Sequence, residues 1–413
     1  MLKSKLKVGV AVLATSAFLF SCTQDQNTST DTEAFTEVDA IFDARNIDGQ
    51  YIVVFREGAV ENVSSKYPTD YRKAQAEMQS VTKRFLNNAS INAEIVSVYS
   101  NVISGATLKL DKAQLELLKN NKAVKYIEQD RIVSFAPPCG TPNGGPCGTP
   151  DPGTGTGSQE TPYGIIRVNG VTSYTGTNVA FVVDSGVDLD HPDLNVDASR
   201  AFNAFTSGKD GQSADDGNGH GTHVSGTIAA KNNSIGVIGV APGATVIPVK
   251  VLDSRGSGSY SGVIAGVDYV GANGRSGDVA NLSLGGPISQ ALDDAILAAS
   301  NKGIKFALAA GNESSDANNS SPARVNGANI VTISAMDVNN KFASFSNYGN
   351  PPVDYAAPGV AIKSTWKGGG YNTISGTSMA SPHAAGVLLL GAARTDGNVL
   401  NDPDGNPDAI IVH

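Results

Sequence analysis

Asp184, His220 and Ser378 are far apart in the chain, but together they have the residue types needed to cleave an acyl bond. A serine hydroxyl is too weak an acid to attack a carbonyl carbon unaided, so it needs a histidine as general base. A carboxylate is needed in turn to fix the imidazole tautomer and to stabilise the imidazolium cation. The three residues therefore predict nucleophilic catalysis through an acyl-enzyme.

Each of these residues stands at the end of a predicted element. Asp184 follows the apolar run Val179–Val183, which predicts a buried parallel strand with a carboxylate at the edge where ligands collect. His220 precedes a helical pattern of small residues. Ser378 precedes the uncharged run Met379–Leu390, a predicted buried helix whose free N–H groups would stabilise negative charge beside the serine oxygen. Taken alone, Ser378 could equally be an ordinary N-cap of a core helix.

The chain resembles the subtilisin-like serine proteases in three segments that follow the family's order Asp, His, Ser: Asp184-Ser185-Gly186-Val187, His220-Gly221-Thr222-His223-Val224 and Gly376-Thr377-Ser378-Met379-Ala380. The similarity covers roughly residues 162–393. It leans toward the proteinase K branch in two further segments, Ala309-Ala310-Gly311-Asn312 and Phe345-Ser346-Asn347-Tyr348-Gly349. The resemblance implies that Asp184, His220 and Ser378 are the catalytic triad.

The resemblance also assigns the oxyanion donors and the remaining histidines. Asn312 matches the family's oxyanion asparagine, and the backbone N–H of Ser378 would be the second donor. His223 is a competing base by sequence, but the family match makes it structural. Two histidines beside prolines are expected to pack or to cap helices, His191 and His383.

A peptide substrate is expected to add as an extended strand to exposed backbone. The family's two cleft-edge segments are matched by Gly258-Ser259-Tyr260 and Ser283-Leu284-Gly285-Gly286, while Ala309, Ala310 and Gly311 would floor a roomy primary pocket. The sequence reveals no charged group for that pocket, so a broad preference for apolar or aromatic side chains is expected. Any one of these glycines could equally belong to an ordinary turn.

The region before this domain predicts a small α+β unit of order βαββαβ, the split ferredoxin-like arrangement. Its expected elements are Tyr51–Phe55, Tyr71–Asn87, Glu94–Tyr99, Ala106–Leu110, Asp111–Asn120 and Val124–Glu128. This superfold has many functions, but before a subtilase domain it resembles the family's inhibitor-like propeptide, which would assist folding and plug the cleft. A free-standing protease inhibitor would explain only residues 51–133.

From Asn178 onward, apolar runs alternate with helical stretches of small residues, which predicts an α/β fold with a parallel central sheet and helices on both faces. The length of 413 residues allows two or three domains, and the net charge of −9 argues against nucleic-acid binding. The pattern stops beyond Arg394. The acidic segment Asp402–Asp408 is explained as a solvated turn, with a calcium loop as the alternative.

The N-terminus predicts export. Lysines precede the apolar run Val8–Phe20, which is too short for a transmembrane helix. The run leads into Cys22 and resembles a bacterial lipoprotein signal, so we expect lipidation of Cys22 and an outer-membrane lipoprotein; because Phe20 departs from that motif, secretion to the exterior is the alternative. Export permits a disulfide, and a single bridge between Cys139 and Cys147 is favoured over a metal site.

The expected divisions are a signal peptide (1–21), a polar tether (22–48), a propeptide (49–135), a Gly/Pro-rich linker (136–160), a catalytic domain (161–396) and an acidic tail (397–413). Cleavage is expected near Phe135-Ala136 or, because prolines follow there, near Gly157-Ser158. The protein would be a monomer acting on protein and peptide substrates, with its own propeptide as inhibitor and no cofactor for catalysis. The resemblance implies structural calcium, bound by Ala328, Ile330 and Asp354. The rival hypothesis is a catalytically silent subtilase fold that binds peptides.

Overall fold

The computed structural model describes residues 46–134 and 158–413. The targeting segment, the tether up to residue 45, Cys22, Cys139, Cys147 and the Phe135-Ala136 bond lie outside this part, so the predictions made for them remain predictions. Among the described residues, no helix is both long and apolar enough to cross a membrane.

The N-terminal domain has the predicted βαββαβ order, with one short extra helix. Its elements are β1 (Asn46–Phe55), α2 (Val63–Lys66), α3 (Tyr71–Asn88), β2 (Glu94–Tyr99), β3 (Gly105–Lys109), α4 (Lys112–Lys119) and β4 (Val124–Ser134). The strands form an antiparallel sheet in the order β2-β3-β1-β4. Strand β1 begins within the expected tether, because Asn46 pairs with Arg131 beyond an irregularity in the ladder.

The second domain is built on a mainly parallel sheet. Its strands run in the order β18-β19-β15-β14-β12-β10-β5-β8-β6, with β7 also paired to β8. Strand β5 (Ala180–Asp184) matches the predicted run Val179–Val183 closely, and the other strands near the candidate site are β8 (Thr245–Lys250), β10 (Val279–Leu282), β12 (Lys305–Ala309) and β14 (Ile330–Met336). The smaller strands are β6 (Asn195–Val196), β7 (Phe202–Asn203), β9 (Ser257–Ser259), β11 (Gly286–Pro287), β13 (Ser320–Ser321), β15 (Val353–Pro358), β16 (Ile362–Trp366) and β17 (Gly370–Ile374).

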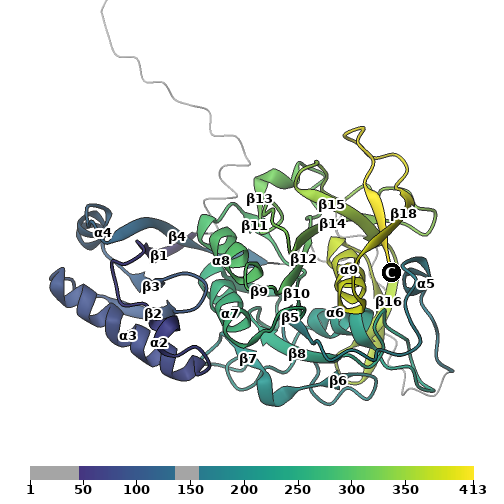
Figure 1. The fold of residues 1–413 in the computed structure, drawn as a ribbon, viewed down its shortest axis with the longest axis horizontal. Coiled ribbons are helices and arrows are strands. Elements are labelled where there is room, and N and C mark those ends of the chain that lie inside the picture. Colours follow the sequence, from purple (N-terminus) through teal and green to yellow (C-terminus); the bar gives the residue numbers. More distant parts are fainter. Residues whose placement is uncertain (1–45, 135–157) are drawn as a thin grey trace, which may run out of the picture. The chain divides into compact units, whose positions relative to one another are not determined.

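Helices cover both faces of this sheet (Figure 1). Helices α6 (His220–Ala229) and α9 (Thr377–Leu390) pack on one face against Ala180 and Val182 of β5. Helices α7 (Tyr260–Asn273) and α8 (Gln290–Ser300) pack on the other face against Phe181 and Val183. Successive residues of a strand point to opposite faces, so an uninterrupted apolar run is what a strand buried on both sides requires. Helix α5 (Tyr163–Arg167) and the 3₁₀ turns η1 (Ala198–Arg200) and η2 (Ala317–Asn319) complete the domain.

The C-terminal segment corrects one expectation. The regular pattern does not stop at Arg394, because β18 (Arg394–Asn398) and β19 (Ala409–Val412) form a hairpin whose second strand pairs with β15. The acidic segment Asp402–Asp408 lies in the loop between them. The apolar run in β19 is only four residues long, too short for its periodicity to predict a strand.

Candidate active site

The carboxyl ends of three neighbouring parallel strands bring the predicted site residues together. Strand β5 ends at Asp184, its neighbour β10 leads into Ser283, and the next strand, β12, leads into Asn312. Ser378 joins this edge through Ser283: its Oγ donates to the Ser283 carbonyl at 3.2 Å, and Ser283 Oγ donates to the Ser378 carbonyl at 2.8 Å. The candidate nucleophile therefore lies at the edge that carries Asp184.

His220 is oriented by Asp184. Its Nδ1 lies 2.9 Å from Asp184 Oδ1 and 3.0 Å from Oδ2, so the tautomer protonated on Nδ1 donates to the carboxylate and presents Nε2 as the base. Ser185 N–H also donates to Asp184 Oδ1. The start of α6 approaches this strand end closely, because a Cβ on Gly221 would lie only 2.0 Å from the Gly186 carbonyl oxygen. Glycine is therefore required directly after His220.

Two N–H groups flank one point beside Gly376. A Cβ placed on Gly376 would lie 3.6 Å from Ser378 N and 3.7 Å from Asn312 Nδ2. Thr377 donates from its backbone N at 2.8 Å and from its Oγ1 at 3.0 Å, both to Asn312 Oδ1. Because both bonds engage the acceptor end of the amide, Asn312 keeps its Nδ2 donor for an oxyanion.

The two cleft-edge segments enclose the last strand of the N-terminal domain. Strand β4 pairs antiparallel with β9, with Val133 opposite Gly258 and Ile132 opposite Ser259. Val133 is fully buried in a cluster that includes Tyr260 and Leu284. Gly286 borders the same side chain, because a Cβ on it would lie 3.9 Å from Val133 Cγ2. The predicted substrate groove thus accepts an added strand. That strand is β4 of the same chain.

The residues named for the primary pocket are small, and two of them are buried, Ala309 and Ala310. A Cβ on Gly311 would lie 2.6 Å from Glu313 Oε2 and 2.3 Å from Asn347 Nδ2. Glu313 is itself exposed, and its carboxylate accepts a hydrogen bond from Asn347 Nδ2 at 2.8 Å, so it is not a buried charge of the pocket floor. The preference for apolar or aromatic side chains stays a prediction.

Comparisons with known proteins agree with this geometry. A family model described as the subtilase family matches residues 175–397, and another, described as peptidase inhibitor I9, matches residues 50–136. Alkaline serine exoprotease A of Vibrio alginolyticus is 39% identical over 355 residues, which cover 83% of this chain and 60% of that relative. Subtilisin E of Bacillus subtilis (strain 168) is 38% identical over 338 residues, which cover 80% of each chain. The crystal structure of a cold-adapted subtilisin-like serine proteinase is 37% identical, covers 60% of this chain and 97% of its own, and gives a TM-score of 0.53.

The chain belongs to the subtilase family. It is a subtilisin-like serine endopeptidase preceded by an I9 inhibitor domain, in which residues 46–134 form the inhibitor domain and residues 158–413 include the subtilase domain.

Besides the β4–β9 pairing, carboxylates link the inhibitor domain to the subtilase domain. Glu128 Oε2 accepts the backbone N–H of Ala291 at the start of α8, and Asp130 Oδ1 accepts that of Ser261 at the start of α7, both at 3.1 Å. From the other side, fully buried Asp268 accepts the backbone N–H groups of the inhibitor-domain residues Ser100, Asn101 and Val102. Burial raises the pKa of Asp268 to about 6, although these three hydrogen bonds act to lower it.

The other predicted histidines bond to backbone carbonyl oxygens. His223 Nε2 lies 2.9 Å from the Ile362 carbonyl, and burial followed by the nearby His220 lowers the pKa of His223 to about 3. His383 Nδ1 lies 2.8 Å from the Met379 carbonyl, and burial lowers the pKa of His383 to about 4. His191 Nε2 lies 3.0 Å from the Gly370 carbonyl. These contacts fit the structural roles expected for all three.

The residues named for calcium fit an ion only in part. Asp354 Oδ2 already accepts the Thr332 backbone N–H at 2.8 Å, and burial raises the pKa of Asp354. Within the described residues, no group of three or more His, Cys, Asp or Glu side chains is arranged for a metal. A cation at this site would therefore depend on carbonyl oxygens such as those of Ala328 and Ile330.

A second set of oxygens, missed from the sequence, fits calcium better. Gln159 Nε2 lies 2.7 Å from the Lys231 carbonyl, and between 3.3 and 3.5 Å from Asn233 Oδ1 and the Ile235 and Val237 carbonyls. Asp193 borders the same loop and accepts from Asn233 Nδ2 and from Val237 N–H. Four oxygens thus converge on the Gln159 side chain, and oxygen atoms are the ligands that calcium prefers. Three of the four are backbone carbonyls, which carry no residue signature, and this is why sequence reasoning missed the set.

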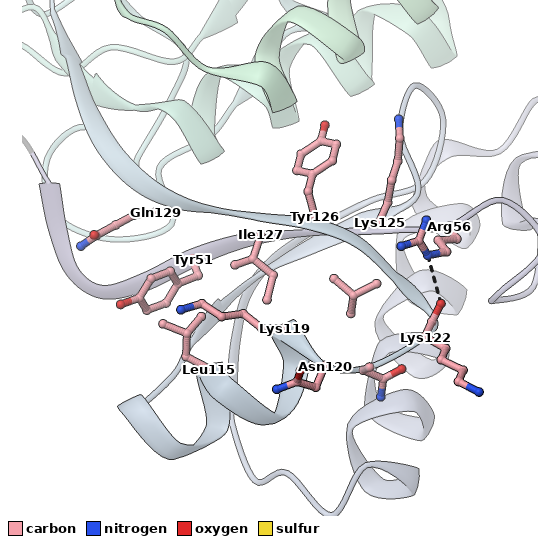
Figure 2. Close-up of a pocket in the computed structure, with 12 residues that line it drawn as sticks. Tyr51, Arg56, Leu115, Lys119, Asn120, Lys122, Lys125, Tyr126, Ile127 and Gln129 are labelled. Carbon is pink, nitrogen blue, oxygen red and sulfur yellow. Dashed lines mark hydrogen bonds between the residues drawn. The ribbon is translucent and has the colours of Figure 1, made fainter.

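A groove of about 690 Å³ lies on the inhibitor domain, away from the triad (Figure 2). Its lining includes Arg56, Lys119, Lys122 and Lys125. Two of these lysines are already paired, Lys119 with Glu116 and Lys125 with Asp294 of α8. We interpret the groove as a solvated face of the inhibitor domain, since surface pairs of this kind contribute little.

Proposed function

We propose that Ser378, His220 and Asp184 hydrolyse peptide bonds in proteins and peptides through an acyl-enzyme. His220 Nε2 removes the Ser378 Oγ proton as Oγ attacks the substrate carbonyl carbon, and the resulting oxyanion accepts hydrogen bonds from Asn312 Nδ2 and Ser378 N–H. His220 then protonates the leaving amine, and water repeats the sequence to release the acid and restore Ser378. The observation that carries this proposal is the pairing of His220 with Asp184 at the strand edge to which Ser378 is bound.

The protein is made as an autoinhibited precursor in this proposal. Strand β4 occupies the groove beside β9, where a substrate strand would lie, and its last residue, Ser134, pairs there with Ser257. Cleavage within residues 135–158 would separate the domains covalently while their contacts persist.

Specificity and location complete the proposal. The buried position of Val133 favours an apolar side chain at the corresponding substrate position, and the small residues of the primary pocket favour apolar or aromatic groups there. The mature enzyme is a monomer, exported and either anchored through lipid on Cys22 or released. Calcium is a structural ion, held by the oxygens of residues 231–237 around Gln159 and, more weakly, near Asp354.

The decisive experiment uses Ser378→Ala. Expressed without other proteases, this variant should accumulate as an uncleaved precursor, whereas wild type matures and is labelled on Ser378 by a fluorophosphonate. Maturation of the variant at the wild-type rate would refute the assignment of the nucleophile. Absence of labelling in correctly processed wild type would favour the silent peptide-binding alternative.

A further inference from the structure

Asn347 lies fully buried beneath the loop that carries Asn312 and bonds to residues on both sides of it. Its Oδ1 accepts the backbone N–H groups of Glu313 and Ser315, each at 3.0 Å. Its Nδ2 donates to the Ala310 carbonyl at 3.0 Å and to Glu313 Oε2 at 2.8 Å. An amide is one of the few uncharged side chains that can donate and accept in this way at once.

The backbone around Asn347 extends this clamp. Asn347 N–H donates to the Gly311 carbonyl at 2.9 Å, so Asn347 contacts the residues directly before and directly after Asn312. The neighbouring Ser346 Oγ accepts the Ala335 N–H of β14 at 3.0 Å, which ties the clamp to the main sheet. Asn347 therefore holds residues 310–315 in place, and Ser346 connects Asn347 to strand β14.

Gly311 is shaped for this contact. Its φ is +107°, a conformation that L side chains rarely adopt. A Cβ there would lie 2.3 Å from Asn347 Nδ2, so any other residue would displace the clamping amide. Gly311 and Asn347 are therefore complementary, although they are far apart in sequence.

We propose that Asn347 is a positioning residue for the oxyanion site, which acts on the reaction only through Asn312. The inference rests on the proposed function of Asn312. Thr377 orients the Asn312 amide, but the place of that amide depends on the backbone of residues 310–315, which Asn347 holds. A hydrogen-bond donor stabilises an oxyanion only at about 2.7–3.1 Å, and a shift of about 1 Å in a reacting group can cost about 10²-fold in rate.

The test is a double-mutant cycle on matured enzyme, with active sites counted by fluorophosphonate labelling. Asn347→Ala should lower kcat roughly 10- to 100-fold while KM changes less than about twofold, because the lost donor acts on the transition state. In an Asn312→Ala background the same substitution should lower kcat by less than about twofold, since the group it positions is gone. Equal losses in both backgrounds, or an unchanged kcat in the single variant, would overturn the proposal.

Asn203 supplies the matched control. It also clamps a loop, donating to the Asp210 and Ser213 carbonyls at 2.8 Å and accepting the Phe205 N–H at 3.0 Å. Asn203→Ala should lower the melting temperature but leave kcat unchanged; an equal fall in kcat would mean that any loop loss lowers activity and would contradict a specific role for Asn347.

If Asn347→Ala does not fold, Asn347→Asp provides the same test. Aspartate keeps the acceptor but cannot donate, and it places a carboxylate beside Glu313. Adding Glu313→Gln should recover part of kcat by supplying a donor, and failure of this rescue would count against the clamp. Loss of all activity in Ser378→Ala is measured alongside, so that failure of the proposed nucleophile is distinguished from failure of this inference.

Discussion

At the scale of single residues, the site depends on which end of each polar side chain is already occupied. His220 has its Nδ1 against Asp184, and Asn312 has its Oδ1 against Thr377. In both cases a neighbour fixes the orientation of a group that could otherwise rotate by 180°. The opposite end is then the one that the proposed reaction requires, Nε2 of His220 as base and Nδ2 of Asn312 as oxyanion donor.

Thr377→Val tests this orientation. Valine keeps the shape but removes Oγ1, which donates to Asn312 Oδ1 and accepts the Gly311 N–H at 3.1 Å, while the backbone N–H of Thr377 remains. We expect kcat to fall by roughly 3- to 20-fold, less than the roughly 10²–10³-fold expected for Asn312→Ala. Steady-state kinetics with a peptide substrate measures both variants, and a larger loss for Thr377→Val than for Asn312→Ala would be inconsistent with an indirect role.

At the scale of elements, the N-termini of α7 and α8 serve the inhibitor domain. Each receives a carboxylate from β4, Asp130 at α7 and Glu128 at α8, where unpaired N–H groups and the helix dipole favour negative charge. The inhibitor domain therefore binds by capping helices as well as by adding a strand.

Removing one cap should weaken inhibition without touching the cleft. Losing a capping carboxylate costs about 0.5–2 kcal/mol, so Asp130→Ala should raise the inhibition constant of the cleaved propeptide by roughly 2- to 30-fold. Titration of the mature enzyme with the wild-type propeptide and with the Asp130→Ala propeptide measures the two inhibition constants. Lys109→Ala is the control, because Lys109 pairs only across the inhibitor domain's own surface with Glu94; an equal effect of that substitution would argue against capping.

Asp268 should make this association depend on pH. Its pKa is raised to about 6 in the precursor by burial, whereas exposure after release would return it toward its ordinary value of 3.8. A group whose pKa is higher in the complex stabilises the complex at low pH, and that contribution is lost as pH rises from about 4 to about 6. Propeptide bound to Ser378→Ala enzyme should therefore dissociate more readily at pH 7 than at pH 4.5.

The isosteric variant Asp268→Asn controls for other groups, because its amide oxygen still accepts hydrogen bonds but does not titrate. The pH dependence should be smaller in this variant, and the remainder belongs to Glu128, Asp130 and Asp293, whose pKa values burial also raises. An identical pH profile for both proteins would exclude Asp268 as the cause.

At the scale of the whole molecule, Gln159 and Glu160 bond to the loop of residues 231–238 and so connect the start of the subtilase domain to the rest of that domain. Glu160 N–H donates to the Gly236 carbonyl, Ile238 N–H donates to the Glu160 carbonyl, and Lys363 pairs with Glu160. Glu160, the last residue of the expected linker, is thus bonded to the body of the subtilase domain. A cation bound among these oxygens would stabilise the folded domain only.

Chelation should lower the melting temperature. An ion at 100 times its dissociation constant stabilises by about 2.7 kcal/mol, which corresponds to roughly 5–10 °C for a domain of this size. Gln159→Ala should lose most of the difference between calcium and EDTA in differential scanning calorimetry, whereas Asp354→Asn should keep most of it. The opposite ranking of the two variants would assign the ion to the Asp354 site.

The sequence alone predicted the main strands and helices around the central sheet, and it named candidate site residues whose roles stay predictions. Uninterrupted apolar runs such as Val179–Val183 can be satisfied only by a strand covered on both faces, and three short motifs stand at element ends where chemistry collects. These signals lie within short stretches of sequence, so they can be recognised before the structure is known.

Only the tertiary structure decided which distant groups support those motifs. Asn347, Asp268 and the carbonyl oxygens around Gln159 act through contacts between segments that are far apart in the chain, and backbone oxygens carry no residue signature. Strand β19 was not predicted for a related reason. Its run of four residues is too short to indicate a strand by itself, and it forms one by pairing with the edge of β15. Packing between distant segments determines these positions, and a local sequence pattern does not reveal which distant segments will pack together.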